Sequence, residues 1–171
     1  MHQLSTDRTA SGEAFWRFSL ALYSRPGIAE TLIALQERAG LDVNLILFGL
    51  WLGAYEARLL SADELLQARA AIAPLTSTAV APLRQLRRQL KPASDSDLQA
   101  LRRRVAGLEI EAERRVQHRL AGQFVGASGA PPEGDRLAIA AANLALILGG
   151  EAASPEVGVL CQALGALIRP S

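Results

Sequence analysis

The chain has 171 residues and a formal net charge of +1, and half of its residues are hydrophobic. This length is typical of one domain, and so apolar a composition supports a sizeable core and excludes global disorder. The single cysteine, Cys161, excludes a disulfide framework and a zinc site built from several thiolates.

The composition predicts an all-α fold: a single compact domain of seven or eight helices with no sheet. Alanine and leucine, with 31 and 29 residues, lose little on entering a helix, and no alternating strand of useful length is present. After ten polar residues expected to be frayed, the predicted helices cover about residues 11–23, 26–38, 43–60, 62–72, a segment that ends near residue 90, 97–121, 135–148 and 155–168. Pro82 either kinks the helix that ends near residue 90 or marks its first turn.

Local signals set these boundaries. Asp42 is a predicted N-cap, and Ser61 and Glu64 form a predicted capping box at the start of the next helix. Pro74 is expected to end the helix that begins at this capping box. The helix from residue 43 is apolar nearly all round, so it is predicted to be central. Gly49 and Gly53 on its surface indicate the close approach of a neighbouring helix.

Three regions follow from this pattern. We expect a core helical domain with a long antiparallel hairpin over residues 1–121, a flexible Gly/Pro loop over 122–134, and a C-terminal helical pair over 135–171 that packs on the core. No apolar run reaches the length of a membrane span. With no secretory signal and a lone cysteine, the expected compartment is the cytoplasm.

A string of residues in the N-terminal half resembles a family of bacterial proteins, mainly proteobacterial, that is carried as a domain of unknown function. Its matching elements are Phe15-Trp16 with Tyr23, Pro26-Gly27, Leu35-Gln36, Gly40, Asp42-Val43-Asn44 running into Trp51, the stretch from Pro82 to Lys91, and the region Glu109–Gln117. The likeness covers roughly residues 12–121. It implies a helical bacterial protein without an assigned activity.

The sequence holds no recognisable catalytic or metal-binding motif. It lacks a phosphate-binding loop, a nucleophile elbow and the Glu-x-x-His pairs of a di-iron bundle, so no catalytic residue, metal or cofactor is predicted. Asn44 is unusual because it opens an apolar helix. Its covered amide either ties down a neighbouring segment or faces a pocket lined by aromatic residues. The candidate pocket residues are Trp16, Asn44, Phe48, Trp51 and Tyr55.

The charge is unevenly distributed, because residues 82–119 carry ten basic and five acidic side chains. Seven of these bases have no acid three or four residues away in their own helix, and an antiparallel hairpin brings them to one end. This candidate anion- or partner-binding set comprises Arg84, Arg87, Arg88, Lys91, Arg102, Arg103 and Arg104.

Three functions remain open. The first is a non-enzymatic interaction or adaptor protein that docks an acidic protein surface, or another anionic ligand, through the Arg-rich hairpin end. The second is an enzyme or small-molecule carrier with an aromatic-lined pocket near Asn44 and Trp51, which requires convergent polar groups such as Arg84 and Glu113. The third, nucleic-acid association, fits less well because the isoelectric point is only about 8.0.

Overall fold

A computed structural model describes residues 2–124, 136–149 and 154–168. The described residues are all-α, as predicted, with eight α-helices, one π-helical segment and no strand. The helices before the hairpin are α1 (His2–Tyr23), α2 (Ile28–Ala39), α3 (Val43–Ala54) and α4 (Ala62–Leu75). The others are α5 (Ala81–Gln89), α6 (Ser96–Phe124), α7 (Arg136–Leu148) and α8 (Pro155–Ile168), and the π-helical segment η1 covers Thr76–Val80.

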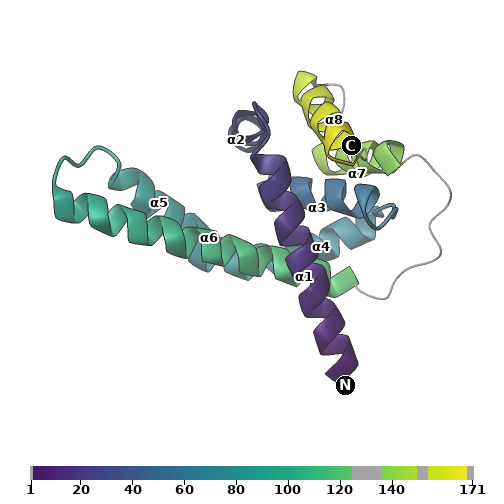
Figure 1. The fold of residues 1–171 in the computed structure, drawn as a ribbon, viewed down its shortest axis with the longest axis horizontal. Helices are drawn as coiled ribbons and strands as arrows, with labels where there is room; N and C mark the ends of the chain where they lie inside the picture. Colours follow the sequence, from purple (N-terminus) through teal and green to yellow (C-terminus); the bar gives the residue numbers. More distant parts are fainter. Residues whose placement is uncertain (1, 125–135, 150–153, 169–171) are drawn as a thin grey trace.

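Helix α3 is the centre of the fold, as its all-round apolar surface predicts. Every residue from Asn44 to Ala54 is buried. Helices α1, α6, α7 and α8 all pack against it, and Figure 1 shows α3 enclosed between α4 and α7. At its start, the Asp42 carboxylate accepts a hydrogen bond from the Asn44 backbone N–H at 2.8 Å, so Asp42 caps the helix as predicted.

The predicted close approach at Gly49 and Gly53 is confirmed, and the neighbour is α7. A Cβ atom placed on Gly53 would lie 2.3 Å from the Cα atom of Ala140. One placed on Gly49 would lie 2.5 Å from Cδ1 of Ile147. The two helices therefore meet almost backbone to backbone at Gly53.

Three predicted boundaries are wrong. Helix α1 begins at His2 rather than near Ser11, because an established helix extends at little cost. Helix α3 ends at Ala54 rather than about Leu60, because Asn143 of α7 binds the following segment. Pro74 lies inside α4, and the chain continues through η1 into α5. Proline removes one helical hydrogen bond, which bends a helix without necessarily ending it.

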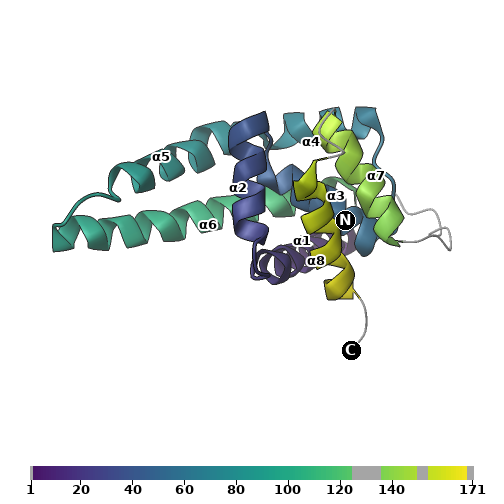
Figure 2. The ribbon, with the colours of Figure 1, turned by 90° about the horizontal axis from the view of Figure 1, so that it is seen from above.

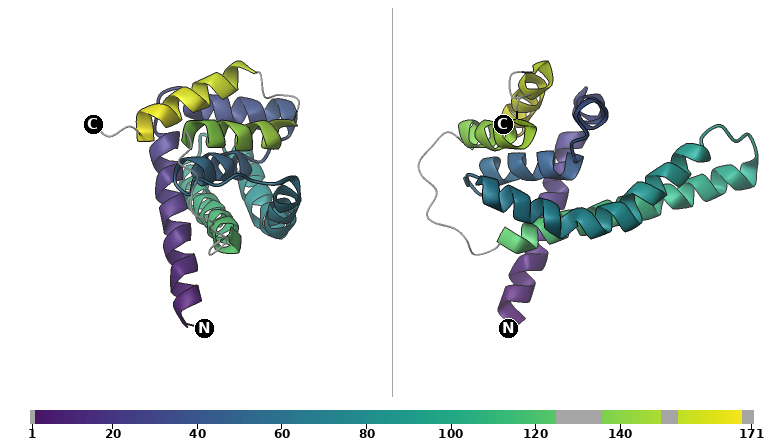
Figure 3. Two further views of the ribbon diagram at one scale, coloured as in Figure 1. Left: turned by 90° about the vertical axis from the view of Figure 1, so that its right-hand side faces the viewer. Right: turned by 180° about the vertical axis from the view of Figure 1, so that it is seen from behind.

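The α5–α6 hairpin projects from the body as a long arm (Figures 1 and 2). Helix α1 crosses α6 near the base of this arm, and its N-terminal end extends away from the other helices (Figure 3). Residues 122–124 belong to α6, and the rest of the predicted Gly/Pro loop lies outside the described residues. None of the helices in the described ranges is long and apolar enough to cross a membrane.

Candidate ligand-binding site

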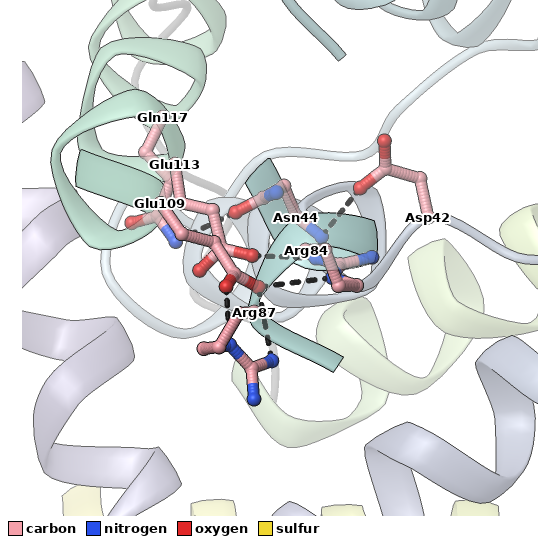
Figure 4. A network of polar contacts seen from close by, with 7 residues as sticks. All are labelled: Asp42, Asn44, Arg84, Arg87, Glu109, Glu113 and Gln117. Carbon is pink, nitrogen blue, oxygen red and sulfur yellow. Dashed lines mark hydrogen bonds and ion pairs between the residues drawn. The ribbon is translucent and has the colours of Figure 1, made fainter. Parts of the chain in front are cut away.

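Two arginines of α5 are ion-paired to two glutamates of α6 (Figure 4). Arg84 donates from Nε to Glu109 at 3.2 Å and from Nη2 to Glu113 at 2.6 Å. Arg87 donates to both carboxylate oxygens of Glu109, at 2.5 and 3.2 Å. Glu109 and Glu113 are four residues apart and so lie on one face of α6. These bonds hold the two helices of the arm together near its base.

The pairing divides the predicted basic set of seven residues. Arg84 and Arg87 have their acids on the facing helix, which spacing within a single helix does not reveal. Arg88 lies 3.7 Å from Glu37 of α2, and both side chains are largely exposed. The remaining four form no ion pair within the described part of the chain; they are Lys91, Arg102, Arg103 and Arg104.

The pKa values of the two glutamates are shifted in opposite directions. Burial alone would raise the pKa of Glu109, but the hydrogen bonds from Arg87 and Arg84 outweigh it and hold that pKa below its ordinary value. Burial raises the pKa of Glu113, and its pairing with Arg84 only partly opposes this effect. Burial also raises the pKa of the nearby Tyr23 hydroxyl.

A cavity of about 520 Å³ lies between α1, α2, α3 and the base of the arm. Its volume is within the range of small-molecule sites. Five arginines line it: Arg84, Arg87, Arg88, Arg102 and Arg103. Its other walls are mainly apolar and include Trp16, Leu20, Tyr23, Ile33, Val43, Leu47 and Ile110. The site thus combines cationic and apolar surfaces.

Part of the cavity wall is buried and polar. Gln117 of α6 donates a hydrogen bond from Nε2 to Oδ1 of Asn44 at 3.0 Å (Figure 4). Gln117 and Ser19 of α1 are only 2% and 3% exposed. Both residues line the cavity, and neither the Gln117 Oε1 atom nor the Ser19 Oγ atom has a hydrogen-bond partner among the residues that the structure describes.

The candidate aromatic pocket is only partly reproduced by this cavity. Trp16 and Asn44 line it. Phe48 and Trp51 lie instead in the core. The centroid of the Phe15 ring is 5.7 Å from that of Phe48 and 5.2 Å from that of Trp51. Tyr55 lies at the other end of α3 beside Phe18. Phe48, Trp51 and Tyr55 share one face of α3, but Phe15 and Phe18 of α1 pack against that face, so these aromatic residues form core contacts and do not line an open pocket.

Sequence reasoning missed Ser19 and Gln117. Each is a polar residue on the buried face of its helix: Ser19 lies four residues after the buried Phe15 and three before the buried Leu22, and Gln117 lies three residues before the buried Leu120. That interruption of an apolar stripe is the signal, and it is the same signal that singles out Asn44. Within the described ranges, no three potential metal-ligating side chains of His, Cys, Asp or Glu lie together.

The fold and site therefore define an all-helical protein with an arginine-lined, partly apolar cavity. The chain belongs to the family described as protein of unknown function DUF2390, which matches residues 14–120. The resemblance to an uncharacterised domain is thus confirmed, and the matched region contains every residue that lines the cavity. No curated protein and no solved structure matches the chain.

Proposed function

We propose that this protein is a non-catalytic binding protein for a small amphipathic anion, which it holds in the cavity between α1, α2, α3 and the α5–α6 arm. The observation that carries the proposal is the convergence of five arginines from two helices on one cavity of about 520 Å³. Arginine suits this role because its planar guanidinium binds carboxylate and phosphate groups through two hydrogen bonds.

The internal acids leave cationic capacity for a ligand. Glu109 and Glu113 are the carboxylates among the lining residues, and they engage Arg84 and Arg87. Arg102 and Arg103 line the same cavity with no ion partner in the described chain, and the Nε atom of Arg102 is buried without a hydrogen bond. A buried cationic donor without a partner is costly, which favours an anion from outside.

The apolar walls set the second requirement for the ligand. Trp16, Leu20 and Val43 offer no hydrogen bonds from their aliphatic and ring surfaces, so they favour a hydrocarbon body over a fully polar metabolite. The supported ligand class is therefore a carboxylate or phosphate attached to an apolar chain or ring.

Decanoate is a suitable probe, with decanol as its uncharged counterpart, and calorimetry measures the affinity. The chain offers a matched pair of variants: Arg103 and Arg104 are adjacent, exposed and without ion partners in the described residues, but only Arg103 lines the cavity. We expect decanoate to bind saturably and decanol weakly. Arg103→Ala should weaken decanoate binding about tenfold, the loss of one charge-assisted contact, and Arg104→Ala should change it by less than about twofold. Absence of saturable decanoate binding overturns the proposal.

A second candidate function is the adaptor role, in which the arm docks an acidic protein. It is supported by Lys91 and Arg104, which lie on the projecting hairpin outside the cavity lining and have no ion partner in the described chain. An oligoglutamate peptide tests it. Docking along the arm requires Lys91→Ala and Arg104→Ala to weaken peptide binding as much as Arg103→Ala does. Equal binding of duplex DNA, with a steep salt dependence, would instead favour nucleic-acid association.

A further inference from the structure

The wall of the cavity carries a surplus of positive charge. Its charged lining residues are five arginines and two glutamates, which give a net charge of +3 when all are ionised. The two glutamates engage Arg84 and Arg87. Arg102 and Arg103 form no ion pair among the described residues. Two cations at adjacent positions of α6 are therefore available to an external group.

These two arginines lie on the arm side of the ion-paired network. Arg102 and Arg103 precede Glu109 by seven and six residues, which corresponds to a rise of about 10 Å along α6 toward the tip of the arm. The apolar lining side chains of α1 and α3, such as Leu20 and Leu47, belong to the body of the fold (Figure 1). The cationic surplus and this apolar wall thus occupy different parts of the cavity, which suits an acid group at one end of an apolar body.

The amount of positive charge identifies the acid group. A guanidinium stays protonated in proteins, so neither Arg102 nor Arg103 can lose its charge to relieve the repulsion between them. A carboxylate brings one negative charge and compensates one arginine. A phosphate monoester carries close to two negative charges near neutral pH, because its second pKa is about 6. Its three terminal oxygens also accept hydrogen bonds from two guanidinium groups together.

We infer that the ligand is a phosphate monoester of a single apolar chain or ring, whose dianionic phosphate is bound by Arg102 and Arg103 and whose apolar part lies against α1 and α3. This inference rests on the proposed function and specifies its ligand class. The cavity of about 520 Å³ limits the apolar part to one chain or ring, since this volume is typical of small-molecule sites. Recognition is non-covalent and requires no chemical step.

Calorimetry with decyl phosphate and methyl decyl phosphate tests the inference, because the two esters share the chain and the phosphate but differ in charge. The methyl diester stays a monoanion. At about pH 7.5 the wild-type protein is expected to bind decyl phosphate about tenfold more tightly, as one further charge-assisted contact provides. At about pH 5 decyl phosphate is a monoanion as well, and the preference should fall to about twofold or less. Titration of the lining residues Tyr23, Glu109 and Glu113 acts on both esters alike, so the ratio reports the second charge of the ligand.

Arg102→Gln and Arg103→Gln are each expected to reduce the preference at about pH 7.5 to about twofold or less, since each removes one of the two charges that the dianion compensates. Arg104→Gln is the matched control. Arg104 is adjacent to Arg103 and exposed but does not line the cavity, so this variant should keep the preference. If Arg102→Gln fails to fold, Arg103→Gln decides the question, because Arg103 is exposed.

Equal affinity of the wild-type protein for the two esters overturns the inference and leaves the proposed function intact. A preference that persists at about pH 5 or in Arg103→Gln also overturns it, because the second charge is then not what these arginines recognise. Tighter binding to vesicles of phosphatidylcholine and phosphatidate than to decyl phosphate overturns the single-chain ligand in favour of a membrane lipid. Failure of decanoate and of both esters to bind overturns the proposed function itself.

Discussion

The Nε2 atom of Gln117 lies 3.0 Å from the Oδ1 atom of Asn44 and donates a hydrogen bond to it, which joins α6 to the start of the central helix α3. Both side chains are buried. The bond therefore links two elements 73 residues apart and fixes the position of the Gln117 carbonyl oxygen at the cavity. The hydrogen bond stabilises the packing of α6 on α3, and the two residues that form it also line the cavity.

Replacement of Asn44 by alanine should lower the free energy of unfolding by about 1–3 kcal/mol, because it leaves the buried Gln117 amide donor without its acceptor. Urea denaturation measures the change. In a double-mutant cycle, Gln117→Met should cost less in the Asn44→Ala background than in the wild type. Strictly additive effects would show that the two side chains do not interact.

A larger loss is expected at Asn143 of α7. Its amide donates to the carbonyl oxygens of Gly49 and Arg58, and its Oδ1 accepts from the Leu60 backbone N–H at 2.7 Å. Asn143→Ala leaves several buried backbone groups unpaired at about 1–3 kcal/mol each. Thermal and urea unfolding should therefore show Asn143→Ala to be more destabilising than Asn44→Ala. The reverse order would contradict this account of the segment after α3.

Alanine substitutions at two glycines, one in the α3–α7 contact and one on the open side of α6, are predicted to have opposite effects on stability. Gly53→Ala forces a methyl group against the Ala140 backbone, so we expect a loss of about 1–3 kcal/mol or more in unfolding free energy. Gly107 lies in α6 with open space around its Cα atom. Gly107→Ala should instead stabilise by up to about 1 kcal/mol, the difference in helix propensity. Calorimetric melting of the two variants measures both, and a neutral Gly53→Ala would refute the close packing.

The opposite pKa shifts of Glu109 and Glu113 predict opposite dependences on pH. Because the folded pKa of Glu109 is lowered, its contribution to stability is present above the ordinary glutamate pKa and is lost as pH falls through the lowered value. Because the pKa of Glu113 is raised, its contribution is present below the ordinary value and is lost as pH rises through the raised one.

Urea unfolding over the acidic and near-neutral range tests this with two matched variants. The stability advantage of wild type over Glu109→Gln should shrink as pH falls, and the advantage over Glu113→Gln should grow. Parallel curves for the two variants would show that the carboxylates share one environment.

Much of the fold could be predicted because helix starts are encoded locally. The Asp42 cap and the capping box of Ser61 and Glu64 depend on atoms within three residues of each other, and both are present as predicted. The end of α3 could not be predicted in this way. It depends on Asn143, more than 80 residues away, whose hydrogen bonds stabilise the segment after Ala54.

The site was less predictable, because its polar partners come from different helices. Spacing within α5 correctly shows no acid beside Arg84, but the acid is Glu109, 25 residues further on. Asn44 could be recognised as a polar residue that interrupts an apolar helix. The aromatic residues concentrated in the N-terminal part of the sequence predict that Trp51 lines the pocket, but its helix is buried on all sides.

The central claim is that the cavity beside Ser19 and Gln117, rather than the exposed arm, is the binding surface. Backbone amide chemical shifts of the labelled protein, recorded during titration with decanoate, test this most directly. The account predicts that the largest changes fall on Trp16, Ser19, Arg103 and Gln117, with Lys91 and Arg104 little affected. Changes centred on Lys91 and Arg104, with Ser19 and Gln117 unmoved, would contradict it.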